Sequence, residues 1–195
     1  MFMKFAGMIG NVLGNYDKAL FALLAPFIAP LFFGGQDPVT ALILTYALLP
    51  LGILTKPLGS LFFGWMGDRY SRKKAFCCSL LGMAASTLAL GCLPVYQTVG
   101  AWAPVGLGLA RMLQGFFAAG ESTGAVLFIL ENSAPPKRSL LSSFYGVSSI
   151  VGYVIASGLV TLFCMQGHIE ETWRVLFWMG GITAIAGFLD RKSVV

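Results

Sequence analysis

Charged side chains are scarce in this sequence of 195 residues, because only 11% of its residues are Asp, Glu, Lys or Arg whereas 57% are hydrophobic. A soluble domain usually has about a quarter of its residues charged. The scarcity excludes a soluble globular domain of this length. The mean hydropathy of +0.80 indicates a membrane protein instead.

Residues that bind metals or form disulfides are also few. The chain has one histidine, His168, and four cysteines, Cys77, Cys78, Cys92 and Cys164, with no Cys-x-x-Cys pair. We interpret the cysteines as small apolar residues and His168 as a solvent-exposed loop residue. No nucleophile–base pair, metal cluster or phosphate-binding loop is readable, so the sequence predicts no enzyme, no metal site and no cofactor.

Long hydrophobic runs dominate the sequence. A helix needs about 20 residues to cross a bilayer core about 30 Å thick, and the hydrophobic runs are that long. Buried strands are excluded, because the runs are too long for them. Gly and Pro recur inside the runs, and membrane helices tolerate them because neighbouring helices satisfy the freed backbone groups. The first run is too long for a signal peptide and is expected to be retained. The sequence predicts an all-α fold of six transmembrane helices near residues 5–33, 40–66, 75–93, 101–130, 140–165 and 172–189.

The basic residues are distributed unequally between the two sides of these six spans. Nine of the thirteen Lys and Arg residues fall on the side of the two termini, the second-to-third loop and the fourth-to-fifth loop. By the positive-inside rule, we expect a protein of the inner membrane with both termini in the cytoplasm. The net charge is +5, but nucleic-acid binding is disfavoured, because the basic residues are divided among short loops.

Six charged residues interrupt the hydrophobic runs. Each costs at least about 2.5 to 3.5 kcal/mol at the centre of a bilayer, so we expect them to face a cavity or one another. They are the functional candidates: Asp17, Lys18, Lys56, Arg111, Glu121 and Glu131.

Helical spacing predicts the depths of these candidates. Arg111 and Glu121 are about 15 Å apart along the fourth run and roughly 80° apart around it, so they could line one cavity. Asp17 is expected near mid-membrane, about level with Glu121, whereas Lys18 projects about 100° away toward a different neighbour. Glu131 is expected near the cytoplasmic surface, level with the basic second-to-third loop.

Structural roles are the alternative for the same residues. Asp17 and Lys18 could form a neutralising pair, Lys56 could reach a head group, and Arg111 could donate to backbone carbonyls. We favour a functional role for Asp17 and Glu121, because an ionisable group at mid-depth is by default a pathway residue, and a structural role for Lys56.

Small residues are concentrated in the fourth run. In membranes such residues let helix backbones approach closely, so we expect them to serve packing more than substrate binding. They are Gly106, Gly108, Gly115, Ala118, Ala119, Gly120 and Gly124.

The second-to-third loop is predicted to be a tight turn, and it carries a recognisable pattern in "GWMGDRYSRKK", residues 64–74. It resembles the signature turn of the major facilitator superfamily. The pattern of that turn is Gly-x-x-x-Asp-Arg-x-Gly followed by two basic residues, where x is any residue. Ser71 stands where the pattern has Gly. The residues that fit are Gly64, Asp68, Arg69, Arg72 and Lys73.

A more specific resemblance begins at "RMLQGFFAAGESTGAVLFILENSAPPKRS", residues 111–139. This stretch is similar to the fourth helix and following loop of the metabolite:proton symporters, especially the proline/betaine transporters. "IGNVLGNYDKAL" and "KPLGSLFFGWMGDRY" extend the resemblance over nearly the whole chain. The chain departs from the family pattern in the first helix, where Gly14 and Asn15 replace an acid and an aromatic residue and Lys18 replaces an aromatic residue.

The resemblance implies roles for the candidates. Asp17, Arg111 and Glu121 are expected in or near a central cavity, where they bind substrate or couple its movement to protons. A cytoplasmic gate is expected from Gly64, Asp68, Arg69, Arg72, Lys73 and Glu131.

The resemblance also implies a partner. Transporters of this fold have two six-helix halves with the substrate site between them, and this chain ends just after its sixth run. We therefore expect the N-terminal half of a transporter that carries a proline- or betaine-like osmolyte by proton symport, in a lipid bilayer, with a second half or by self-association. The alternative is a truncated or split membrane protein with no transport activity of its own, or an accessory subunit.

Overall fold

The computed structural model of the protein describes residues 2–131, 135–167 and 169–193. Its described side chains are those of residues 11–12, 14–72, 74–120, 139–140, 142–167, 172–183 and 185. His168, on which one expectation rests, lies outside the described residues.

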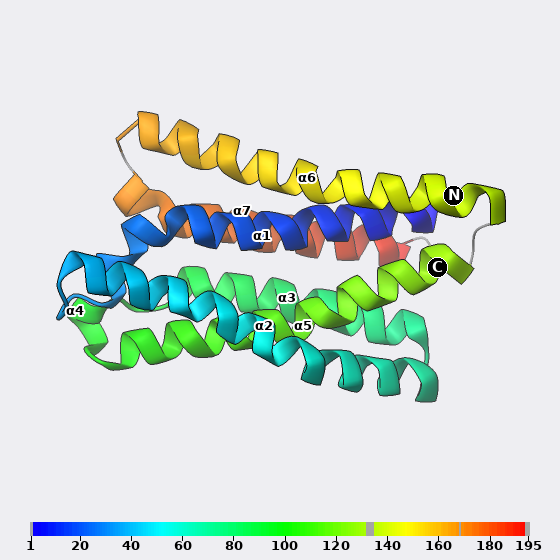
Figure 1. The fold of residues 1–195 in the computed structure, drawn as a ribbon, viewed down its shortest axis with the longest axis horizontal. Helices are drawn as coiled ribbons and strands as arrows, with labels where there is room; N and C mark the ends of the chain where they lie inside the picture. Colours follow the sequence, from blue (N-terminus) through cyan, green and yellow to red (C-terminus); the bar gives the residue numbers. More distant parts are fainter. Residues whose placement is uncertain (1, 132–134, 168, 194–195) are drawn as a thin grey trace.

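The described residues form seven helices and no strand (Figure 1). Each of the six predicted ranges overlaps one long helix, and the one-turn helix α4 was not predicted. Over the described residues, three stretches are long and apolar enough to cross a membrane: Pro38–Arg69, Lys74–Cys92 and Ser142–Met165. That all six long helices cross a membrane stays a prediction. The helices are α1 (Phe2–Phe32), α2 (Pro38–Arg69), α3 (Arg72–Cys92), α4 (Tyr96–Val99), α5 (Trp102–Glu131), α6 (Pro135–Met165) and α7 (Ile169–Ser193).

Local residue chemistry explains where several helices begin and end. Asp37 caps α2 by accepting a hydrogen bond of 3.1 Å from the backbone N–H of Thr40, and Pro38 occupies the first helical position. Only two residues, 70–71, separate α2 from α3, as the tight-turn interpretation expects. Gly100 and Gly167 have φ values of +57° and +73° where α4 and α6 end, a conformation that other residues rarely adopt.

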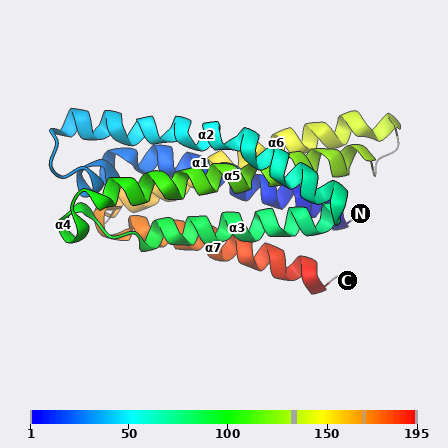
Figure 2. The same cartoon turned by 90° about the horizontal axis from the view of Figure 1, so that it is seen from below.

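The helices run lengthwise, side by side (Figure 1, Figure 2). The N and C marks lie at the end of the bundle that also carries the α2–α3 turn, the last turn of α5 and the first turn of α6. The opposite end carries α4 and the connections α1–α2 and α6–α7. Helix α1 is central, because it packs against α6, α7, α2 and α5, while α3 packs between α5 and α7.

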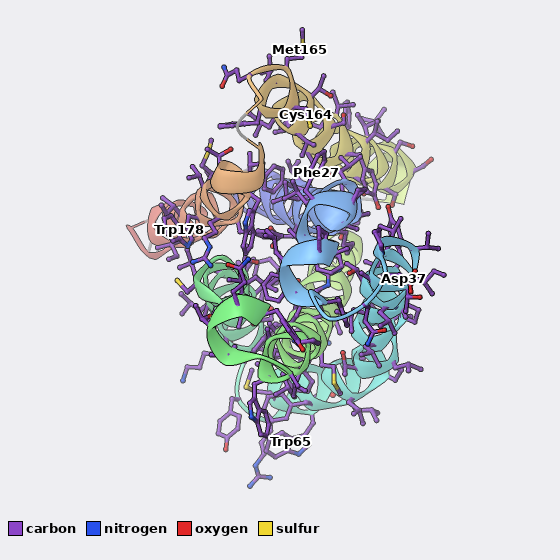
Figure 3. All side chains as sticks on the ribbon, turned by 90° about the vertical axis from the view of Figure 1, so that its left-hand side faces the viewer. Phe27, Asp37, Trp65, Cys164, Met165 and Trp178 are labelled. Atoms are coloured by element: carbon purple, nitrogen blue, oxygen red, sulfur yellow. The ribbon has the colours of Figure 1, made fainter. Side chains whose placement is uncertain are left out.

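The core is built around α1. Phe21, Leu24 and Phe32 are fully buried, and the Phe32 ring meets Trp173 of α7 edge to face at 5.8 Å. The outer surfaces of α2 and α6 are different: large apolar residues such as Leu61 (73% exposed) and Met165 (82%) project outward. Figure 3 shows Trp65 and Met165 pointing away from the bundle. An apolar surface of this extent requires lipid or another protein against it.

Helices α2 and α5 approach each other so closely that glycine is required. A Cβ atom added to Gly115 would collide with the carbonyl oxygen of Gly52, and one added to Gly120 would collide with Phe63. Thr55 donates a 2.8 Å hydrogen bond to the Met112 carbonyl across the same interface. The expected packing role is confirmed for Gly115 and Gly120. A Cβ atom at Gly108 would make only ordinary contacts, and the surroundings of Gly124 lie outside the described part.

Candidate functional site

Two opposite charges are buried inside the bundle. Asp17 of α1 and Arg111 of α5 are each only 6% exposed, as expected for charges that avoid lipid. Thr87 of α3 donates a 2.5 Å hydrogen bond to Asp17 Oδ2 and accepts one of 2.9 Å from Gln114 Nε2. Gln114 Oε1 in turn accepts a 2.5 Å hydrogen bond from Arg111 Nη1. We call Asp17, Thr87, Gln114 and Arg111 the central network.

The surrounding helices hold the two ends of the central network. Tyr16 donates a 3.0 Å hydrogen bond to the Leu176 carbonyl, which joins α1 to α7 beside Asp17. A Cβ atom at Gly180 of α7 would lie 3.0 Å from Asp17 Oδ1, so glycine leaves the room in which that oxygen sits. The Arg111 guanidinium lies 4.0 Å from the centre of the Phe21 ring, a cation–π contact that partly compensates its charge.

The ends of the central network retain unused hydrogen-bonding capacity. Among the described residues, Asp17 Oδ1 and Arg111 Nε are buried without a hydrogen-bond partner. Such atoms are costly in an apolar environment, and they are concentrated at sites of function more often than elsewhere. The arrangement provides a carboxylate that can take up a proton and a cation that can hold a carboxylate.

A second polar group joins α1 to α6. Asn11 Nδ2 lies within 2.9 Å of the Tyr145 carbonyl, Ser148 Oγ and Ser149 Oγ. Lys18 Nζ donates to Asn15 Oδ1 at 3.2 Å on its own helix, and the different neighbour expected for Lys18 stays a prediction.

The structure does not join every predicted residue to the central network. Asp68, Arg69 and Arg72 are exposed at the α2–α3 turn, and Gly64 has open space beside its Cα. Lys56 is half-buried on α2. The gate and the role of the acid on α5 stay predictions, because the side chains of Lys73, Glu121 and Glu131 lie outside those described.

An open groove of about 440 Å³ lies between α2 and α5, away from the central network. Its lining is apolar and includes Leu44, Leu51, Val105 and Met112. None of the four central-network residues lines it. The groove is therefore part of the apolar outer surface and supplies no polar chemistry.

Two members of the central network were missed in the sequence. The search for charges passed over Thr87 and Gln114, which are neutral. Gln114 follows Arg111 by three residues and so lies on the same helix face, which is a usable signal. Nothing in the sequence pairs Thr87 with Asp17, 70 residues earlier, since that contact comes from the packing of α3 against its neighbours.

Comparisons with known proteins agree with this fold. The family described as "Sugar (and other) transporter" matches residues 3–191. A proline/betaine transporter of Salmonella typhimurium is 35% identical over 193 residues, which are 97% of this chain and 39% of that protein. A glycine betaine/proline/ectoine/pipecolic acid transporter of Dickeya dadantii is 36% identical over 97% of this chain and 38% of its own length. This chain thus spans about two fifths of the length of these relatives.

Solved structures show the same architecture. The partially occluded inward-open form of the xylose transporter XylE from E. coli superposes with a TM-score of 0.85 at 17% identity, over 98% of this chain and 47% of that chain. A structure titled D-xylose-proton symporter gives a TM-score of 0.77 at 17% identity, over 96% of this chain and 46% of its own. At such identity the likeness concerns the fold.

Proposed function

Because this chain belongs to the sugar (and other) transporter family of the major facilitator superfamily, which comprises membrane transporters and not enzymes, we propose that it is one six-helix half of a proton-coupled transporter. The observation that carries the proposal is the central network. Burial of its carboxylate and guanidinium is unfavourable, and packing alone does not need charged residues at these positions. The second half is another six-helix unit or a second copy of the chain, and the site lies between the two.

The proposed substrate is a small zwitterion of the proline or betaine class. Relatives that carry these names are 35% and 36% identical to this chain over the 193 aligned residues. A zwitterion of this class carries a carboxylate, and the central network offers the Arg111 cation to bind it once a proton has neutralised Asp17. The Arg111 guanidinium suits a carboxylate, which it can bind through two parallel N–H groups.

Proton coupling is assigned to Asp17, with Glu121 as the second acid on the pathway. Uptake of a proton by Asp17 removes the negative charge of the central network and changes what Arg111 can bind. Substrate then binds between the halves, and the halves rock about it to face the other side. Asp68, Arg72 and Glu131 form the gate that closes the cytoplasmic side in the outward-facing state, with Gly64, Arg69 and Lys73 shaping its turn.

The proposed topology has six spans, with both termini in the cytoplasm. Single cysteines at Gln36 and Lys74, in a variant that lacks the four native cysteines, test it with a membrane-impermeant thiol reagent in intact cells. The cysteine at Gln36 is expected to react from outside, and the one at Lys74 only after the cells are opened. The reverse pattern contradicts the topology.

Uptake in vesicles tests transport itself. The chain is reconstituted alone, or after co-expression with the C-terminal half of a proline/betaine transporter, and labelled proline and glycine betaine are supplied with an inward proton gradient. We expect no gradient-driven uptake from the chain alone, and uptake with the second half that Asp17→Asn abolishes. Uptake by the chain alone would show that a second six-helix unit is unnecessary.

The rival function, a membrane protein without transport activity, makes a different prediction in this assay. It predicts no uptake under either condition, although the co-expressed half is present and inserted. Substrate-dependent uptake that collapses when the gradient is dissipated rules it out.

A further inference from the structure

The hydrogen bonds of the central network all run in one direction. Arg111 donates to Gln114, Gln114 donates to Thr87, and Thr87 donates to Asp17. Each donor thus lies on the side of the cation and each acceptor on the side of the carboxylate. The described side chains of α1, α3 and α5 form a continuous polarised path between two opposite charges.

The chemistry of the two ends imposes this direction. A guanidinium has only donors, so Gln114 must turn its carbonyl oxygen toward Arg111 and its NH₂ group toward Thr87. An ionised carboxylate has only acceptors, so the single O–H of Thr87 must point at Asp17. Neither middle residue can reverse its bond while both ends are charged.

Protonation of Asp17 removes the negative charge that forces the Thr87 O–H to point at Asp17. A hydrogen bond to an ionised acceptor is roughly twice as strong as one between neutral groups. The Thr87–Asp17 bond therefore weakens if the proton resides on Oδ1, and must reverse if it resides on Oδ2. Either change reaches Gln114, because its NH₂ group donates to the same Thr87 oxygen.

We propose that Thr87 and Gln114 are positioning residues that transmit the protonation state of Asp17 to Arg111. The inference rests on the proposed function in taking Asp17 as the protonated site and Arg111 as the group that binds the substrate carboxylate. Gln114 holds the guanidinium in place while Asp17 is ionised, and loosening of the path releases it toward a substrate carboxylate. Thr87 and Gln114 thus connect proton uptake to substrate binding without contacting the substrate themselves.

Among the described side chains, this path is the hydrogen-bonded connection between Asp17 and Arg111. The charged groups whose fields act on Asp17 are Arg111 on α5 and Lys18 beside it on α1. Tyr16, also on α1, donates to the Leu176 carbonyl of α7. Among the described side chains, α3 meets Asp17 with the neutral Thr87, and α7 meets it at Gly180, which has no side chain.

Infrared difference spectroscopy can follow both ends of the path in one pH titration of the full chain in lipid vesicles. The carboxyl band of Asp17 is the one that Asp17→Asn removes, and the guanidinium band of Arg111 is the one that Arg111→Lys removes. In the unmodified protein, we expect the guanidinium band to shift at the midpoint pH of the carboxyl band. In Thr87→Val the carboxyl still titrates, but the guanidinium shift at that midpoint is lost.

Matched variants separate transmission from folding. Thr87→Ser retains the hydroxyl and is expected to restore the guanidinium shift. Thr45→Val is the control, because Thr45 is fully buried on α2 and its hydroxyl donates only within that helix, to the Ala41 carbonyl at 2.8 Å. Gln114→Leu breaks the path at its other link and is expected to lose the shift as Thr87→Val does, which provides a second test if either variant misfolds.

The possible outcomes distinguish the inference from the proposed function. A guanidinium shift that persists in folded Thr87→Val and Gln114→Leu overturns the path while leaving Asp17 as the proton site. Absence of any titrating band that Asp17→Asn removes overturns both. Loss of the shift in the two path variants, with its retention in Thr87→Ser and Thr45→Val, supports the inference.

Discussion

The charges of this chain occupy two regions with opposite surroundings. Asp17 and Arg111 lie in the interior, each 6% exposed. Asp17 accepts a hydrogen bond from Thr87, and Arg111 donates one to Gln114. Asp68 and Arg69 lie at the α2–α3 turn, where both side chains are exposed. Both regions were singled out in the sequence because charge is scarce. In the interior region, hydrogen bonds through Thr87 and Gln114 link the two opposite charges.

The difference shows what the bilayer requires of each region. A charge inside the bundle must find partners, because neither lipid nor a packed core solvates it. A charge at a turn is solvated by water and head groups, so it can serve orientation or gating without a fixed partner. The consequences of substitution should therefore differ between the regions in size and in kind.

The largest expected effect comes from removing the interior cation. Arg111→Leu leaves the Asp17 carboxylate buried without a compensating charge, which should lower the free energy of unfolding by about 3 to 5 kcal/mol. Arg69→Leu at the turn is the matched variant and should change it by less than about 0.5 kcal/mol. Reversible unfolding in mixed micelles measures both, and equal losses would contradict the contrast between the regions.

A smaller effect is expected from glycines of the two regions. Gly115→Ala forces a methyl group against the Gly52 backbone and should destabilise the protein by about 1 to 3 kcal/mol. Gly64→Ala, beside open space at the turn end of α2, should cost less than about 0.5 kcal/mol or stabilise the helix slightly. Thermal unfolding of the two variants in the same detergent is the comparison, and a larger loss for Gly64→Ala would refute it.

The turn region should respond in conformation more than in stability. We predict that Glu131→Gln, introduced into a complete transporter, removes a gate contact worth about 1 kcal/mol, which is about fivefold in a conformational equilibrium. The shift should favour inward-facing states. A thiol probe on the cytoplasmic side should then react faster than in the parent, and an unchanged rate would count against the gate.

The smallest effect concerns the cap of α2. Hydrogen bonds from Thr40, first from its side chain and then from its backbone N–H, hold the pKa of Asp37 below its ordinary range. Because the folded-state pKa is lowered, the cap is fully effective above the unfolded value of about 3.9 and is lost as pH falls through the folded-state value. Asp37→Asn keeps the cap without titrating, so its unfolding midpoint should fall less steeply below about pH 4 than that of the parent.

Much of the fold was predictable because hydrophobic length is a local property. Each of the six expected ranges overlaps a long helix, and the signature around residues 64–74 correctly predicted a tight turn. The helix α4 was missed because four residues, Tyr96–Val99, are too few to give a periodic pattern. Helix ends differed from the expected ones by a few residues, since they depend on caps such as Asp37 more than on hydropathy.

The candidate site was predictable only in part. Asp17 and Arg111 could be identified because a charge in an apolar run is conspicuous, and the structure joins them through Thr87 and Gln114. Gln114 could have been identified from its spacing of three residues after Arg111. Thr87 could not, because a threonine in a membrane helix is unremarkable until its neighbour is known.

The sequence by itself determined the membrane class, the number and approximate extent of the long helices, and the burial of Asp17 and Arg111, because these depend on composition and on the spacing of residues along one helix. The tertiary structure alone decided that Asp17 meets Thr87 of α3, that Arg111 lies over Phe21, and that Gly52 and Gly115 bring α2 and α5 into backbone contact. These contacts join residues from separate helices. Their partners depend on how the helices rotate and pack against one another, which no single stretch of sequence specifies.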